Sequence, residues 1–235
     1  MEEPSSHDFE AEARLLAASI DHTVLEAHAS TGEISYACRE AAQMGCAAIC
    51  VSPAYVAQAR SEVNGRTKVA VLIGHPFGLS LPVAKAYEAE VAVKEGAQEV
   101  DLVLGVGWLR EGDYAKTASE IEMVRRAIGP EVLLKATLLF DLLDDDSKVA
   151  GVVLCLESSC DYVVAAGEKL SHRDIYLIHD ITRGEKGIKA SGPLKDWKMV
   201  EAMLGAGMTR LGTAWGAALL KAQRLQWQQR NARWA

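Results

Sequence analysis

Three charged residues lie in apolar stretches that read as buried strands: Asp101 in EVDLVLG, Lys135 in EVLLKATL and Lys189 in KGIKASG. Burial disfavours an ammonium group, and a second ammonium nearby disfavours it further, so one of these lysines could be a free amine at neutral pH. A free amine attacks a carbonyl to form a Schiff base, and a carboxylate such as Asp101 can relay protons. The three residues therefore suggest carbonyl chemistry.

The same residues have a structural interpretation. A buried lysine and a buried carboxylate can form ion pairs whose only role is to hold packed strands together. Which interpretation applies depends on whether the three side chains meet at one place, and hence on the elements that carry them.

Eight short apolar segments recur every 22 to 33 residues and lack the polar alternation of half-exposed strands, as expected when both faces are buried. We predict strands at residues 16–21, 47–52, 68–74, 99–105, 131–138, 161–166, 186–191 and 209–214.

Helix signals separate these segments. Ser30 and Glu33 form a capping-box pattern, and Gly45 can end that helix. Asp113 and Gly129 bracket another helix in the same way. Further helices are predicted near 82–96, 145–158, 171–179, 195–204 and 215–230, and one face of the first can hold Val83, Ala84, Tyr87 and Val91.

Eight strand-then-helix units predict an α/β protein of the (β/α)8 TIM-barrel type. A doubly wound sheet is the alternative, but the segment after the first strand, DHTVLEAHA, has no glycine for a phosphate loop. We expect a flexible N-terminal arm over residues 1–12 and a single barrel domain over 13–235.

Composition narrows the class of protein. The chain has 235 residues, 49% of them hydrophobic and 24% charged, with a net charge of −7. It has no basic stripe for nucleic acid, no apolar run long enough for a membrane span and no secretory signal. The five cysteines and six histidines show no metal-ligand spacing. We expect a cytoplasmic protein with reduced thiols, no metal and no cofactor.

The carboxyl ends of barrel strands and the loops after them build the active sites of TIM barrels. Asp21 and Thr23 are placed there to bind a hydroxylated substrate, or to satisfy loop backbone groups. We interpret Cys50 as a thiol of the core rather than a nucleophile, and His75 as a candidate general acid or base. Gly212–Gly216 leads from a strand into a helix, a common phosphate site, but Trp215 adds bulk.

Together these motifs resemble the deoxyribose-phosphate aldolases, class I aldolases with a (β/α)8 fold, from about Leu15 to Leu220. The matching segments include IDHTVL, AAICVSPAYV, KVAVLIGHPFG, VLLKATL, GIKASG and AGMTRLGTAWG. The resemblance implies a reversible aldol reaction through a lysine Schiff base in an often dimeric protein. It assigns the proton relay to Asp101 and the second lysine of the site to Lys189, and places Lys135, Asp21, Thr23 and Cys50 around the site.

The chain departs from this family at the mouth of the predicted barrel. The Schiff-base lysine of the family falls on Val164, in CDYVVAAGEK, and residues 159–168 contain no lysine. Pro193 replaces a glycine whose amide could bind phosphate. Ala214 and Trp215 replace serines, and Leu139, Phe140 and His75 make the mouth more apolar and aromatic.

We therefore expect a divergent enzyme that acts on a carbonyl-containing, unphosphorylated small molecule, by aldol-type bond making or breaking or a related cyclisation or isomerisation, in specialised biosynthesis. Its catalytic residues would be Asp101, Lys189, Lys135 and His75, and its substrate-binding residues Asp21, Thr23, Cys50, Phe140, Val164, Ser191 and Trp215. An aldolase that uses Lys189 as its nucleophile is a special case. The alternative is a catalytically inactive pseudo-aldolase that binds a ligand or partner. We expect a homodimer.

Overall fold

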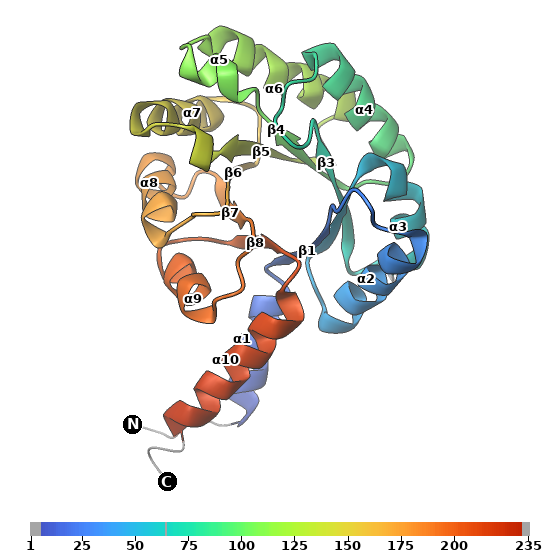
Figure 1. The fold of residues 1–235 in the computed structure, drawn as a ribbon, viewed down its shortest axis with the longest axis vertical. Coiled ribbons are helices and arrows are strands. Elements are labelled where there is room, and N and C mark those ends of the chain that lie inside the picture. Colours follow the sequence, from blue (N-terminus) through green and yellow to red (C-terminus); the bar gives the residue numbers. More distant parts are fainter. Residues whose placement is uncertain (1–5, 64, 232–235) are drawn as a thin grey trace.

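A computed structural model of the chain describes residues 6–63 and 65–231. Eight parallel strands form a closed barrel in the order β1 to β8, which confirms the predicted fold class (Figure 1). The strands are β1 (Ile20–Val24), β2 (Ala48–Val51), β3 (Lys68–Ile73), β4 (Glu99–Val103), β5 (Leu133–Leu139), β6 (Tyr162–Ala166), β7 (Gly187–Ser191) and β8 (Arg210–Thr213).

Helices surround the barrel and connect its strands. They are α1 (Ser6–Ala17), α2 (Thr31–Met44), α3 (Val56–Glu62), α4 (Pro82–Lys94), α5 (Val106–Arg110), α6 (Tyr114–Ile128), α7 (Asp145–Glu157), α8 (His172–Thr182), α9 (Trp197–Gly205) and α10 (Gly216–Asn231), with short 3-10 turns η1 (Pro53–Tyr55) and η2 (Phe140–Leu142). None of the helices in the described part of the chain is long and apolar enough to cross a membrane.

Local signals in the sequence fix several helix ends as predicted. Ser30 and Glu33 form a complete capping box at the start of α2, and Gly45 ends that helix in the left-handed conformation, with φ of 75°. The Asp113 side chain accepts the backbone N–H of Lys116 at the start of α6. The caps at Ser30 and Asp113 fix where the segments that follow β1 and β4 at the barrel mouth end.

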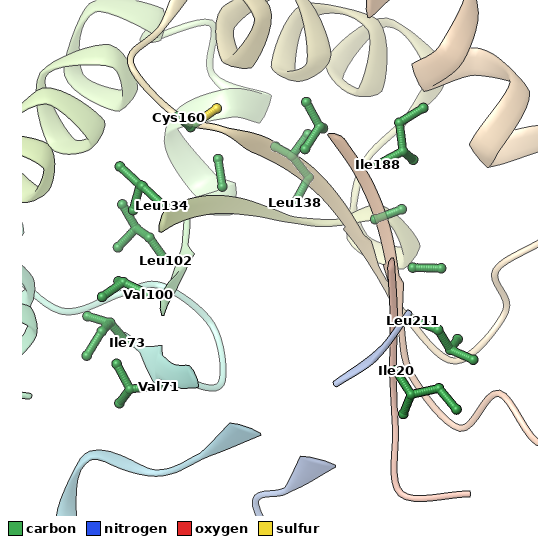
Figure 2. Close-up of a cluster of buried hydrophobic side chains, with 14 of the residues drawn as sticks. Ile20, Val71, Ile73, Val100, Leu102, Leu134, Leu138, Cys160, Ile188 and Leu211 are labelled. Carbon is green, nitrogen blue, oxygen red and sulfur yellow. The ribbon is translucent and has the colours of Figure 1, made fainter. Parts of the chain in front are cut away.

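The barrel has two sets of buried side chains because successive residues of a strand point to opposite faces. The outward set is aliphatic and packs against the helices, as Figure 2 shows for Val100, Leu102 and Leu134 among others. The inward set alternates with it in the sequence. In β4 it comprises Glu99, Asp101 and Val103, so charged side chains point into the barrel interior.

The N-terminal segment differs from the prediction. Residues 6–17 form helix α1 instead of a loose arm or a first strand, and α1 lies beside α10 (Figure 1), where the rings of Phe9 and Trp227 are 5.1 Å apart. The first strand begins at Ile20, so the predicted strand at residues 16–21 was placed too early. Leu16 and Ala17 are buried by helix packing, which a short apolar run does not distinguish from a strand. The rest of the predicted arm, residues 1–5, lies outside the described residues.

Helix α4 exposes its larger apolar side chains. Val83, Tyr87 and Val91 share a face as predicted, but they are 63%, 67% and 38% exposed. The buried face carries small residues and Lys85 instead. Because alanines face the barrel, α4 can pack closely against it while its larger apolar stripe remains uncovered.

Candidate active site

Lys135 occupies the centre of the barrel interior and is surrounded by carboxylates. Its Nζ lies 2.9 Å from Asp21 Oδ2, 2.6 Å from Glu99 Oε2 and 2.9 Å from Asp101 Oδ1, and its side chain is fully buried. The strand register explains this grouping, because Asp101 on β4 pairs directly with Lys135 on β5. Glu99 lies two residues before Asp101 and therefore shares its inward face.

Two further cations complete this cluster. Lys189 Nζ lies 2.6 Å from Asp21 Oδ2 and also forms a short ion pair with Asp101. Arg210 contacts Asp21 and Glu99 at 2.6 and 2.7 Å. Three cations thus face three carboxylates, and their formal charges cancel. We call these six residues the buried charge cluster.

The carboxylates of the cluster raise the pKa of both lysines, which favours the ion-pair interpretation over the free amine. Desolvation alone would lower the pKa of Lys189, but attraction to Asp101 and Asp21 outweighs it and the pKa is raised. The pKa of Lys135 is raised further, because three carboxylates surround it. The same contacts lower the pKa values of Asp21 and Asp101 despite their burial. The sequence does not show these carboxylates around each lysine, and it therefore left the two interpretations open.

A cavity of about 350 Å³ opens above the cluster, at the carboxyl ends of the strands. We call it the mouth cavity. Five of the predicted site residues line it, namely Thr23, His75, Asp101, Ser191 and Trp215. Asp101 is therefore the residue that joins the cavity to the buried charge cluster.

The other predicted site residues do not line the mouth cavity. Lys135, Lys189 and Asp21 lie beneath it in the charge cluster, and a Cβ at Gly212 would lie only 2.8 Å from Lys189 Cε. Val164 faces the barrel interior, in register with Thr137 and Lys189, and is buried. Phe140 is buried in η2, with Lys148 Nζ 5.2 Å from its ring centroid.

Two titratable groups of the predicted site differ in accessibility. Cys50 is buried, as predicted for a core thiol, and burial together with the Asp101 charge raises the pKa of its thiol to about 12. His75 opens to solvent at the mouth, and its partial burial lowers its pKa. The His75 ring is therefore neutral at pH 7 and can accept a proton.

Three amide groups at the mouth already donate within the protein and are not free to bind a phosphate. Gly192 N–H donates to Gly212 O at 3.1 Å, and Gly167 N–H to Ser191 O at 3.1 Å. Trp215 N–H donates to Thr213 Oγ1 at 3.1 Å. Pro193 has no amide hydrogen, and the described residues that line the cavity include no lysine or arginine. A phosphate would find neither these three amides free nor a lysine or arginine among the described residues of the walls.

Sequence reasoning missed Glu99 and Arg210, although Glu99 could have been found from its spacing of two from Asp101. It also missed a second buried pair outside the barrel, where Lys85 Nζ lies 2.6 Å from Glu120 Oε1 and both side chains are fully buried. Lys85 also donates to Val103 O at 2.7 Å, and Gly105 N–H donates to Glu120. This pair anchors the carboxyl end of β4, the strand that carries Asp101.

A closed (β/α)8 barrel with lysine and aspartate side chains under its mouth is an architecture that aldolases use. Residues 15–143 match the model of the DeoC/LacD family aldolases, and the chain belongs to this family.

Curated relatives agree with this assignment. The chain is 35% identical over 211 residues to the deoxyribose-phosphate aldolase of Geobacillus sp. strain WCH70, with 88% of this chain and 95% of the relative covered. It is 33% identical to the deoxyribose-phosphate aldolase of Mannheimia succiniciproducens, covering 88% and 94%. The solved structure of the aldolase QR15 superposes with a TM-score of 0.84 at 27% identity, covering 90% of this chain and 96% of that one.

Proposed function

We propose that this chain is a divergent aldolase that acts on an unphosphorylated carbonyl compound in the mouth cavity without forming a Schiff base. The observation that carries the proposal is that the candidate catalytic residues fall into two groups, one that lines the mouth cavity and one that lies in the buried charge cluster. His75 and Asp101 line the mouth cavity, whereas Lys135 and Lys189 are enclosed among carboxylates that keep them charged. The resemblance drawn from the sequence places Val164 where the Schiff-base lysine of the family would be, which supports the proposal.

The step common to aldol chemistry and carbonyl isomerisation is removal of a proton next to a carbonyl. In our proposal the neutral His75 ring takes that proton, and the C–H electron pair moves into the carbonyl, forming an enolate oxygen. The Ser191 hydroxyl at the mouth is available to donate to that oxygen, whereas the Thr23 hydroxyl already donates to Asp21 O. Asp101 stays ionised, orients a substrate hydroxyl, and is held in place by the two lysines.

The proposal that the substrate lacks phosphate rests on the occupied amides of Gly192 and Trp215, and on cavity walls whose described residues include carboxylates but no lysine or arginine. Trp215, 46% exposed at the rim, occupies space that a phosphate would need, and Lys195 Nζ lies 5.7 Å from the centroid of its ring. We expect 2-deoxyribose and 2-deoxyribose 5-phosphate to bind with equal affinity in calorimetry. Micromolar binding of the phosphate ester alone would contradict this part of the proposal.

Catalysis is tested with a panel of unphosphorylated aldehydes and ketones, followed by NMR. We expect turnover by the wild-type chain and at least a hundredfold loss in His75→Gln, the size of effect that a general base gives. The matched control is His172→Gln, which removes an imidazole at the start of α8. Equal rates for His75→Gln and the wild type would refute the assignment of His75.

A catalytically inactive pseudo-aldolase remains the second candidate, and the charge balance of the cluster favours it. Six charged residues that neutralise one another can hold the barrel together without taking part in any reaction. In this case no carbonyl compound would be turned over, whereas ligands would still bind in the mouth cavity. The panel above separates the two functions directly.

We further propose that the protein forms a homodimer through the exposed face of α4. Besides Val83, Tyr87 and Val91, the exposed apolar side chains of this region include Phe77, Leu79 and Leu81, and all six except Val91 are more than half exposed. Six such side chains offer on the order of 600 Å², most of the about 800 Å² that each partner gives to a standard interface. Sedimentation should show a dimer that Tyr87→Glu dissociates and that Tyr176→Glu, on α8, leaves intact; a wild-type monomer would contradict the proposal.

A further inference from the structure

The segment that carries His75 is a short turn between two glycines. It runs from Gly74 to Gly78, whose φ angles are 73° and 69°, and Gly78 N–H donates to Gly74 O at 2.8 Å. We call residues 74–78 the His75 turn. His75 and Pro76 line the mouth cavity, but His75 is exposed, so the protein does not enclose its ring. The position of the ring therefore depends on the contacts that hold the turn to the barrel.

The end of β4 supports the His75 turn from one side. A Cβ at Gly78 would collide with Leu104 O, so this glycine lies directly against the backbone that follows β4, and a side chain would prevent the approach. The strands before the turn and beneath it are neighbours, with Leu72 of β3 in register with Asp101 of β4. The segments that carry His75 and Asp101 are thus packed against each other.

Lys85 of helix α4 joins the same two segments. Its Nζ donates to Val103 O at 2.7 Å and lies 2.6 Å from Glu120 Oε1. A Cβ at Gly74 would lie 2.8 Å from Lys85 Cε, so the lysine stem packs against the first residue of the His75 turn. The side chain therefore contacts the start of the turn along its stem and the end of β4 through its amino group.

Glu88 makes the remaining contact between α4 and the turn. Its Oε2 accepts Gly74 N–H at 3.3 Å. Lys85 and Glu88 are three residues apart and therefore neighbours on the helix surface. A buried ion pair such as that of Lys85 contributes little net stability compared with apolar packing, whereas hydrogen bonds to backbone groups define where a segment lies. These contacts of α4 suit a role in placing the turn.

We propose that Glu88 is a positioning residue of the candidate active site, which holds the His75 turn through Gly74 and so keeps the His75 ring in place relative to Asp101. Lys85 supports the turn beside it. Glu88 does not line the mouth cavity, so it acts through the turn and not on a substrate. Its effect on turnover rests on the proposed function, in which His75 removes a proton, whereas its hold on the turn does not.

The test compares Glu88→Ala with Glu88→Gln and with the control Glu90→Ala. Alanine removes the acceptor of Gly74 N–H, whereas glutamine keeps a side-chain oxygen that can accept it. Glu88 is only partly buried, so both variants should fold. The control residue lies on the same helix and pairs with Lys94 at the surface.

Turnover is measured as the exchange of the α-hydrogens of propanal for deuterium in D₂O. In Glu88→Ala we expect kcat to fall at least about tenfold while KM changes less than about threefold, because the aldehyde still binds but the base is misplaced. Glu88→Gln should stay within about threefold of the wild type, and Glu90→Ala should match it.

Two NMR measurements test the hold on the turn without any turnover. In Glu88→Ala the Gly74 amide hydrogen should exchange with solvent at least about tenfold faster, and the His75 Cε1–H resonance should shift, whereas Glu90→Ala should change neither. If both changes occur but the wild type does not exchange propanal, the positioning role stands and the proposed function is wrong. Unchanged Gly74 exchange in Glu88→Ala would overturn the inference. A wild-type rate on propanal in Glu88→Ala, or a loss in Glu88→Gln equal to that in Glu88→Ala, would also overturn it.

Discussion

Replacing Lys135 with methionine tests whether the buried charge cluster holds charged lysines. The lysine is fully buried, and its Nζ lies within 3 Å of Asp21, Glu99 and Asp101. Lys135→Met would leave three carboxylates facing two cations, and breaking a buried ion pair in this way costs about 3–5 kcal/mol. In a domain of this size that corresponds to a melting temperature lower by roughly 6–20 °C.

A neutral Lys135 would give a much smaller effect. Methionine has a similar volume, and a volume-conserving exchange in a core costs less than about 1.5 kcal/mol. The free energy of unfolding is measured by urea denaturation, with the exposed Lys68→Met as the control, expected to lie within about 0.5 kcal/mol of the wild type.

A double variant sharpens this prediction. Lys135→Met combined with Asp101→Asn restores the charge balance, with two cations and two carboxylates. We expect it to be more stable than the sum of the two single changes by about 1–3 kcal/mol, the coupling typical of residues in direct contact. A loss below 1.5 kcal/mol in Lys135→Met, or strict additivity in the double variant, would refute the charged cluster.

Three further predictions follow from the same contacts. The pKa values of Asp21 and Asp101 are lowered in the folded state, so the stability that these ionised groups contribute is complete above their unfolded pKa of about 3.9 and is lost as the pH falls through their folded values. The urea concentration at the unfolding midpoint should therefore decrease once the pH falls below about 4. A midpoint concentration that stays constant down to about pH 2 would contradict this. Cys50, with a pKa of about 12, should resist iodoacetamide at pH 8 in the folded chain, as read by peptide mass, and rapid labelling would refute its burial. Lys85→Met should destabilise the chain by about 3–5 kcal/mol in urea denaturation, because it leaves Glu120 buried and unpaired; a change below 1 kcal/mol would show that the pair is not ionised.

The barrel could be predicted from the sequence because its signals are local. Apolar runs at regular spacing mark the strands, and Ser30, Glu33 and Gly45 mark the ends of a helix before any tertiary contact is known. The first strand was misplaced because Leu16 and Ala17 are buried by a helix that packs on α10. Over so short an apolar run, burial by a helix and burial by a strand look alike.

The candidate site was only partly predictable, because its electrostatics depend on residues far apart in the chain. The residues that carry charge at strand ends were recognisable, and Asp101, Lys135 and Lys189 do meet. Their protonation was not recognisable, since Lys189 is paired with Asp21, which lies 168 positions earlier. Whether a buried lysine is a free amine or an ammonium depends on such partners.

The exposed face of α4 shows the same limit. Helical spacing correctly grouped Val83, Tyr87 and Val91 on one side of the helix. Spacing alone does not say whether an apolar stripe faces the barrel or solvent, and here Ala86, Ala89 and Lys85 take the buried side.

The central claim is that the mouth cavity moves protons next to a carbonyl without a Schiff base. It is tested most directly by following the exchange of the α-hydrogens of propanal for deuterium in D₂O by ¹H NMR, before and after the protein is treated with borohydride in the presence of the aldehyde. We predict exchange by the wild-type chain that survives the treatment, because borohydride inactivates only an enzyme whose lysine forms an imine. No exchange at all, or exchange that borohydride abolishes together with a mass adduct on Lys189, would contradict the account.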